Sequence, residues 1–174
     1  LESALRVADR QQRELGYEIQ EIELALRSLN IPVVLLKGAA YVAADLDAAQ
    51  GRVVSDVDVL VPKAALPEVE AALMLGGWAS SARSDYDERY YREWMHELPP
   101  MRHRERGTLL DVHHRILPRT GRVHPPTSRM LGAAVTVAGV RVLSPEHRLL
   151  HAAAHLFQDG EVAGSLRDLV DIAD

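Results

Sequence analysis

The sequence predicts an α/β (α+β) protein with a small mixed β-sheet, helices packed on one side of it, and a C-terminal helical part. Short runs of β-branched and Leu residues alternate with helical segments in the first third, and two hairpin patterns follow. The chain has 174 residues and 47% apolar content, enough for one globular domain with a core. We divide it into a core with an N-terminal helix (1–143) and a helical part (144–174) that we expect to belong to the same globule.

The first half predicts alternating helices and strands. Apolar residues recur at helical spacing from Leu5 to Leu26, which predicts a long amphipathic helix that Asn30 and Pro32 terminate. The elements expected after it are a strand at 31–36, a small-residue helix at 39–46, a strand at 53–61 and a helix at 66–75.

The second half predicts two hairpins and two helices. Segment 80–92 is polar and fits either a loop or an edge strand. Ser144, Pro145 and Glu146 form a strong helix start, because a capping residue precedes Pro at the first position and then an acid. The expected elements are hairpins at 101–104 with 108–113 and at 134–137 with 140–143, a loop at 118–126, a helix from 144 to about 158 and a last helix from 165.

The composition excludes several classes of protein. The net charge of -5 argues against broad, sequence-independent binding of nucleic acid. Without cysteine there is no disulfide framework, thiolate zinc site or cysteine nucleophile. No apolar run is long enough to span a membrane and no signal peptide is visible, so we expect a cytoplasmic protein without a membrane partner. Both ends of the sequence look trimmed.

Two carboxylates interrupt the apolar strand expected at 53–61. Asp56 and Asp58 lie two residues apart, so their side chains share one face of the strand, with Cα atoms about 6.6 Å apart. Two carboxylates so placed can converge on a hard divalent cation, which offsets the cost of their burial. The alternative is a strand end where one Asp caps a turn and the other meets water.

Two further segments fit the same site. Lys37 and Gly38 stand where a strand passes into a helix, a turn whose backbone N–H groups favour a phosphate, although an ordinary βα turn with a solvated lysine is the alternative. Asp111 interrupts another apolar strand and would complete a three-carboxylate cluster suited to Mg²⁺; alone, it fits a hairpin edge. His113 shares the face of Asp111 and could orient Asp111 or contact substrate.

His147, His151 and His155 are spaced four apart on the helix expected from 144. They form one stripe, and two histidines at that spacing can bind zinc. The glutamate that follows the first histidine of a metalloprotease helix is missing, so we favour half-buried, hydrogen-bonded histidines over a zinc site.

The order of these motifs resembles the DNA polymerase beta-like nucleotidyltransferase superfamily, and more narrowly a bacterial nucleotidyltransferase family. The resemblance rests on Leu-Lys-Gly at 36–38, Arg52 followed by Ser55-Asp56-Val57-Asp58, and Asp111-Val112-His113. It runs from about residue 33 to 114, and the segment 144–155 together with Arg167, Asp171 and Asp174 is similar to the family's helical part. One departure is Ala39, where the wider superfamily has Ser or Gly.

The resemblance implies nucleotidyl transfer, in which an acceptor hydroxyl attacks the α-phosphate of an NTP, most readily ATP, and pyrophosphate leaves. It implies Asp56, Asp58 and Asp111 as catalytic ligands of Mg²⁺ (or Mn²⁺), and Lys37, Gly38, Ser55 and Arg52 as nucleotide-binding residues. The acceptor, a small molecule or a protein, stays open. Two alternatives remain: a non-catalytic nucleotide-binding or interaction domain that keeps the fold, and a metal-dependent hydrolase that uses the histidine stripe.

Overall fold

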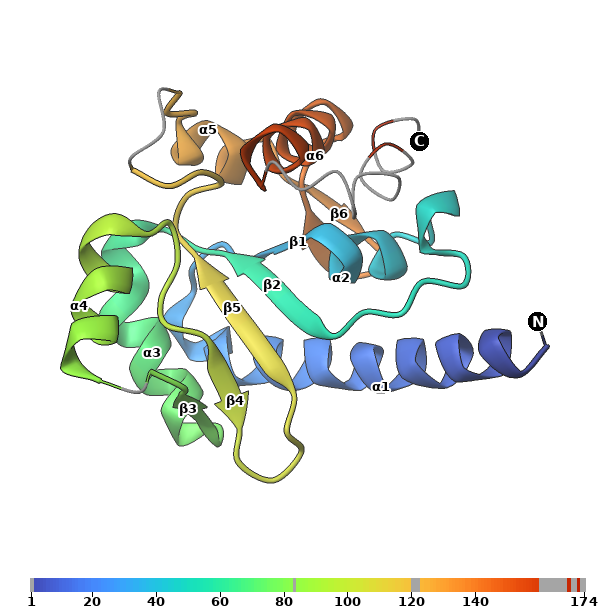
Figure 1. Ribbon diagram of the computed structural model, residues 1–174, viewed down its shortest axis with the longest axis horizontal. Helices are drawn as coiled ribbons and strands as arrows, with labels where there is room; N and C mark the ends of the chain where they lie inside the picture. The colour runs from blue at the N-terminus through green and yellow to red at the C-terminus, as the bar shows by residue number, and fades with distance from the viewer. Residues whose placement is uncertain (1, 83, 120–122, 160–168, 170–171, 173–174) are drawn as a thin grey trace.

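The computed structural model describes residues 2–82, 84–119, 123–159, 169 and 172, and its centre is a seven-stranded mixed sheet with helices around it (Figure 1). The strands are β1 (Val34–Leu36), β2 (Asp56–Leu60), β3 (Trp78–Ser80), β4 (Met101–His103), β5 (Leu109–His113), β6 (Val135–Val137) and β7 (Val140–Val142). The helices are α1 (Glu2–Leu26), α2 (Lys37–Ala43), α3 (Leu66–Leu75), α4 (Asp85–Trp94), α5 (Thr127–Gly132) and α6 (Pro145–Asp159), with short 3₁₀ turns at Arg27–Leu29, Asp47–Ala49 and Lys63–Ala65.

Strand β2 lies in the middle of the sheet, whose order is β3-β4-β5-β2-β1-β7-β6. It pairs in parallel with β5 on one side and antiparallel with β1 on the other. Asp58 is in register with Asp111 of β5 and with Leu36, the last residue of β1. Because β1 ends beside Asp58, the first residue of α2 enters next to this carboxylate.

Two apolar clusters cover the two faces of the sheet. The larger one packs α1, α2 and α3 against Leu35, Val57 and Val59. The smaller one packs α5 residues Met130 and Leu131 against the alternate positions of β1 and β2, including Leu60. The expectation of helices on one side only is therefore wrong, because α5 closes part of the second face. Asp56 and Asp58 share that second face by strand alternation.

Most expected elements are confirmed, including both hairpins, the long helix α1 and the helix α6 that begins after Ser144. Helix α2 begins earlier than expected, at Lys37, and ends at Ala43, while β2 begins only at Asp56. The last helix expected from 165 lies outside the described residues, apart from positions 169 and 172.

The polar segment 80–92 is neither a loop nor an edge strand but mostly helix α4. Ser84 caps it by accepting a hydrogen bond from the Asp87 N–H at 3.1 Å, and three acids occupy its first turn. None of its residues is buried, although Tyr86, Tyr90 and Trp94 recur at helical spacing along one face. Arg92 ties it to α3 through an ion pair with Glu70 at 2.7 Å.

No helix among the described residues is long and apolar enough to cross a membrane.

Alanine substitution at two glycines should have opposite effects on the free energy of unfolding. Gly16 lies within α1 with nothing near the site of a Cβ atom, so Gly16→Ala should raise it by about 0.5–1 kcal/mol. Gly77 has φ +100° and a Cβ there would lie 2.7 Å from His103 Nε2, so Gly77→Ala should lower it by about 1–3 kcal/mol. Urea titrations of both variants check this; a loss at Gly16 would show that α1 packs differently there.

The start of α6 should carry a pH-dependent part of the stability. A hydrogen bond from its own backbone N–H, and then the Ser144 hydroxyl, lower the pKa of Glu146. A carboxylate with a lowered folded-state pKa stabilises the protein above its unfolded value near 4.5, and the effect disappears as the pH falls through the folded value. Glu146→Gln should therefore lower the melting temperature at pH 7 but not at pH 3. An equal difference at both pH values would contradict this assignment.

Candidate functional site

Three carboxylates converge on the second face of the sheet. Asp56 and Asp58 come from β2 and Asp111 from β5, and the parallel register places Asp111 beside Asp58. One ligand atom from each lies within 4.8 Å of the others, as donors around a metal ion would. The three acids singled out in the sequence are thus brought together by strand alternation and sheet pairing.

Lys37 supplies the positive charge nearest to this cluster. Its Nζ donates to Asp58 Oδ1 at 2.7 Å, and the side chain is about one third exposed while that of Asp58 is buried. The backbone of Lys37 has φ +46°, a left-handed conformation that is uncommon for a residue with a side chain. The turn from β1 into α2 thus holds this lysine in a strained conformation against the carboxylate.

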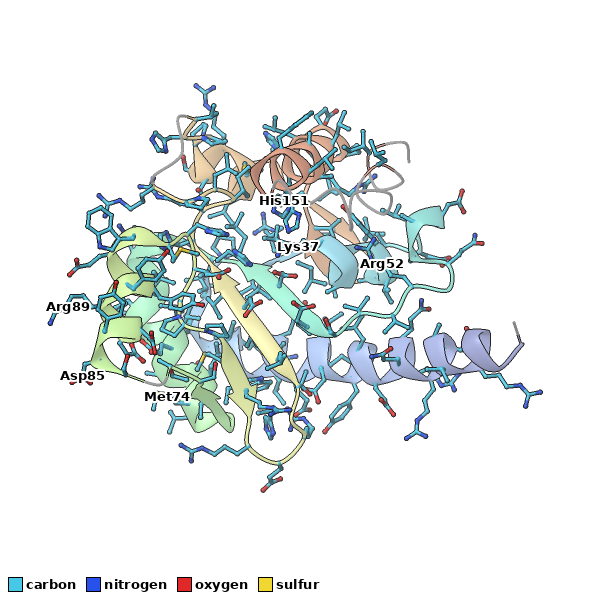
Figure 2. All side chains as sticks on the ribbon, in the orientation of Figure 1. Lys37, Arg52, Met74, Asp85, Arg89 and His151 are labelled. Atoms are coloured by element: carbon cyan, nitrogen blue, oxygen red, sulfur yellow. The ribbon has the colours of Figure 1, made fainter. Side chains whose placement is uncertain are left out.

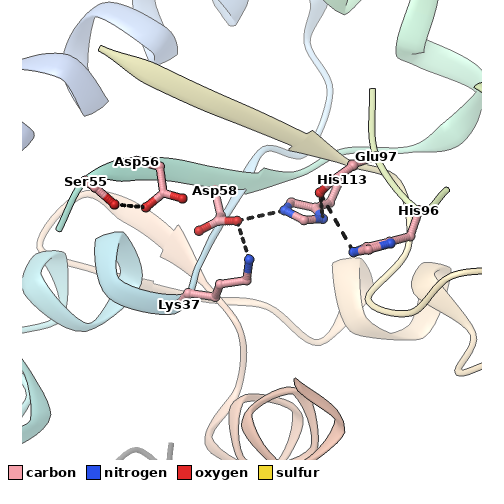
Figure 3. A network of polar contacts seen from close by, with 7 residues as sticks. All are labelled: Lys37, Ser55, Asp56, Asp58, His96, Glu97 and His113. Atoms are coloured by element: carbon pink, nitrogen blue, oxygen red, sulfur yellow. Dashed lines mark hydrogen bonds and ion pairs between the residues drawn. The ribbon is translucent and has the colours of Figure 1, made fainter. Parts of the chain in front are cut away.

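Asp58 Oδ1 also accepts from His113. The distance from His113 Nε2 to this oxygen is 2.8 Å, and His113 is 1% exposed. Both donors reach the same oxygen, and Figure 3 shows the other carboxylate oxygen of Asp58 directed toward Asp56. Asp58 is therefore anchored through one oxygen and presents the second to the acidic cluster.

The charges in the cluster move the pKa values in opposite directions. Burial alone would raise the pKa of Asp58, but the hydrogen bonds and charges of His113 and Lys37 outweigh it and hold this pKa well below its usual range. Burial, followed by the charges of Asp58 and Glu97, raises the pKa of Asp111 to about 6. Burial would lower the pKa of Lys37, yet Asp58 raises it on balance. Asp111 therefore carries the repulsion that a cation would relieve.

A second group of side chains continues from His113. Its Nδ1 lies 3.2 Å from Glu97 Oε2, and the same oxygen lies 3.8 Å from His96 Nε2. Figure 3 shows His113 between Asp58 and the pair His96–Glu97, with Lys37 below Asp58. Burial lowers the pKa of His96 to about 4, and burial raises the pKa of Glu97.

Main-chain pairing places His96 and Glu97 at the end of β5. Glu97 forms an antiparallel bridge with His113, the Leu98 N–H donates to Val112 O at 2.9 Å, and the His114 N–H donates to His96 O at 2.9 Å. The sequence analysis did not select this His-Glu pair. The available signal was an acid and a histidine directly before the buried Leu98.

The other expected site residues surround the cluster rather than join it. Gly38 is buried, and a Cβ atom there would lie 3.0 Å from Val54 Cγ2 and 3.3 Å from Arg52 Nε. The guanidinium of Arg52 lies over the Tyr41 ring, 5.0 Å from its centroid. The Ser55 hydroxyl donates to Asp56 Oδ1 at 3.0 Å. A side chain at position 38 would crowd the side chains of Val54 and Arg52, so the glycine permits their close packing.

The histidine stripe of α6 is divided among different surroundings. His147 lies 3.2 Å from the Ser144 hydroxyl, whereas His151 is buried. Burial, and then the charges of His113 and Lys37, lower the pKa of His151 to about 3, so it faces the acidic cluster as a neutral group (Figure 2). Neither group of potential metal ligands found among the described residues includes a member of this stripe.

A cavity of about 620 Å³ adjoins the acidic cluster between α1 and the turn that joins β4 to β5. Ser55 and Asp56 line one part of it, Tyr17 lines the α1 side, and Arg106 lines the side of the turn. Asp56 is the one carboxylate of the three that lines this space, which is large enough for a small molecule.

Two solved structures share this fold. One is a crystal structure of ANT(2'')-Ia in complex with adenylyl-2''-tobramycin, with a TM-score of 0.59 and 16% identity over 92% of this chain and 86% of that chain. The other is a solution structure of the antibiotic-resistance factor ANT(2'')-Ia, with a TM-score of 0.57 and 17% identity over 94% of this chain and 91% of that one. At these identities the similarity establishes the polymerase beta-like fold.

No curated protein matches the sequence significantly. The protein family described as uncharacterised nucleotidyltransferase matches residues 1–174, the entire sequence. The match agrees with the fold and includes both strands that carry the acids. The chain therefore belongs to this nucleotidyltransferase family and is a transferase.

Proposed function

We propose that this nucleotidyltransferase moves an NMP group from an NTP, with ATP as the first choice, to a hydroxyl group of an acceptor. The convergence of Asp56, Asp58 and Asp111 beside a lysine at a strand-to-helix turn carries this proposal. The acceptor oxygen bonds to the α-phosphorus, the bond from this phosphorus to the bridging oxygen breaks, and pyrophosphate leaves. We expect the reaction in the cytoplasm, where NTP and Mg²⁺ are both present.

The three carboxylates suit a hard divalent cation, with Mg²⁺ preferred and Mn²⁺ as the substitute. Their oxygens lie within 4.8 Å of one another, and burial, followed by the charges of Asp58 and Glu97, raises the pKa of Asp111, so added positive charge would stabilise its ionised form. When bound, such a cation supplies Lewis-acid charge to the phosphate and to the attacking and leaving oxygens. Asp58 holds its orientation through Lys37 and His113, and Ser55 orients Asp56.

Lys37 and the turn at Gly38 would bind the β- and γ-phosphates. Lys37 pairs with Asp58 in this structure, and it would exchange this partner for phosphate oxygens once the carboxylates take up a cation. Arg52, which contacts the Gly38 side of the turn, would add positive charge near the nucleotide. Asp111 would help to accept the proton of the attacking hydroxyl.

The acceptor has room in the cavity that Asp56 borders. The neighbouring structure of ANT(2'')-Ia contains an adenylylated small molecule, adenylyl-2''-tobramycin, which supports a small-molecule acceptor for the fold. The net charge of -5 also favours a small acceptor over broad contact with nucleic acid.

Asp111→Asn should separate metal binding from folding. The variant should melt at a higher temperature than the wild type without metal, since it removes a repelling carboxylate, and Mg²⁺ should raise the melting temperature of the wild type but not that of Asp111→Asn. Asp9→Asn, an exposed change on α1, is the matched control and should respond to Mg²⁺ like the wild type. Thermal melts with and without Mg²⁺ measure this; an equal metal response in Asp111→Asn would exclude the triad as the metal site.

The two lysines of the chain provide a matched test of phosphate binding. Lys37→Ala should weaken the binding of a non-hydrolysable NTP analogue by roughly tenfold or more, and the binding of NMP by about twofold at most. The reason is that only the NTP offers β- and γ-phosphates to the ammonium group. Lys63→Ala, an exposed change outside the cluster, should leave both affinities unchanged. Calorimetric titrations with Mg²⁺ check this, and equal losses for NTP and NMP would place Lys37 away from the phosphates.

A further inference from the structure

His113 Nδ1 faces another hydrogen-bond acceptor, Glu97, in the group of side chains beside the acidic cluster. His113 Nε2 lies 2.8 Å from Asp58 Oδ1, and a carboxylate oxygen can only accept, so the ring donates from Nε2. In a neutral imidazole, Nδ1 then carries a lone pair. This nitrogen makes no hydrogen bond and lies 3.2 Å from Glu97 Oε2. Two lone pairs at this distance require a positive charge between them.

His96 supplies a third potential metal ligand beside His113 and Glu97. One ligand atom each of His96, Glu97 and His113 lies within 4.8 Å of the others. The ligands of one tetrahedral zinc ion lie about 3.4 Å apart, given bond lengths near 2.0–2.1 Å. The distances from Glu97 Oε2 to His113 Nδ1 and to His96 Nε2, 3.2 Å and 3.8 Å, bracket this value.

We propose that His96, Glu97 and His113 bind a Zn²⁺ ion at a site separate from the acidic triad. Two imidazole nitrogens and one carboxylate oxygen form a donor set that zinc prefers over magnesium, and a fourth position stays open for water or substrate. The Asp58–His113 hydrogen bond is the carboxylate–histidine contact that usually supports a zinc-bound histidine. This site does not depend on the proposed transfer reaction.

Zinc at this site would also fix the orientation of Asp58. With Nδ1 bound to the ion, the remaining ring proton sits on Nε2 and donates to Asp58 Oδ1. His113 would then link the two sites, as a ligand of zinc and a positioning residue for the triad. The burial of His96 supports this assignment, since it keeps the ring neutral and able to bind metal.

Cobalt(II) provides the test, because tetrahedral and five-coordinate Co²⁺ with nitrogen ligands absorbs visible light more strongly than the octahedral ion expected at three carboxylates. Metal-free wild-type protein should bind one Co²⁺ per chain and show strong visible bands. Excess Mg²⁺ should leave these bands unchanged, whereas one equivalent of Zn²⁺ should remove them. His96→Ala and Glu97→Gln should lose the bands and weaken Zn²⁺ binding at least about tenfold.

Two control variants locate the ion. Asp111→Asn changes the acidic triad and should keep the bands, and His147→Ala removes one member of the α6 stripe and should also keep them. Circular dichroism verifies that each variant is folded. Two results would overturn the proposal: a wild-type spectrum with weak octahedral bands alone, or a His96→Ala variant that binds Zn²⁺ as tightly as the wild type. The first result would identify a proton as the charge between His113 and Glu97. Nucleotide binding in Mg²⁺ is measured separately, so failure of one proposal does not decide the other.

Discussion

The buried carboxylate of Asp58 is the constraint on which the site depends. It lies in the middle of the sheet, 2% exposed, where an ionised acid is costly unless donors surround it. Lys37 and His113 both donate to its Oδ1, one from the adjoining strand-to-helix turn and one from the neighbouring strand. Breaking such a buried pair would leave an uncompensated charge, so these three residues act as one unit.

Sheet pairing determines the rest of the arrangement. The antiparallel pairing of β1 with β2 brings Lys37 to Asp58, and the parallel pairing of β2 with β5 brings Asp111 to it. His113 follows Asp111 by two residues on the same face and reaches back to Asp58. On this face α5 packs against Leu36 and Leu60, while the opposite face is filled by α1, α2 and α3.

The sequence predicted most of the fold and the acidic half of the site because both depend on short-range patterns. Strand alternation alone aligned Asp56 with Asp58, and the capping signal at Ser144 placed α6. Helix α4 was missed although Tyr86, Tyr90 and Trp94 recur at helical spacing, because the segment is polar overall and buries no residue in the core. Glu97 was missed because it reaches His113 through a bridge between segments that the sequence does not show as neighbours.

The central claim is that the group transferred at Asp58 and its neighbours is a nucleotidyl group. Labelled ATP tests this claim most directly. Protein incubated with Mg²⁺, cell extract and ATP labelled at the α-phosphate should transfer the label to an acceptor, while ATP labelled at the γ-phosphate should release labelled pyrophosphate. Asp58→Asn should do neither. Two results would contradict nucleotidyl transfer at this site, if the wild type gives them and Asp58→Asn does not. One is transfer of the γ-label to an acceptor, and the other is release of the γ-label as orthophosphate with no labelled acceptor.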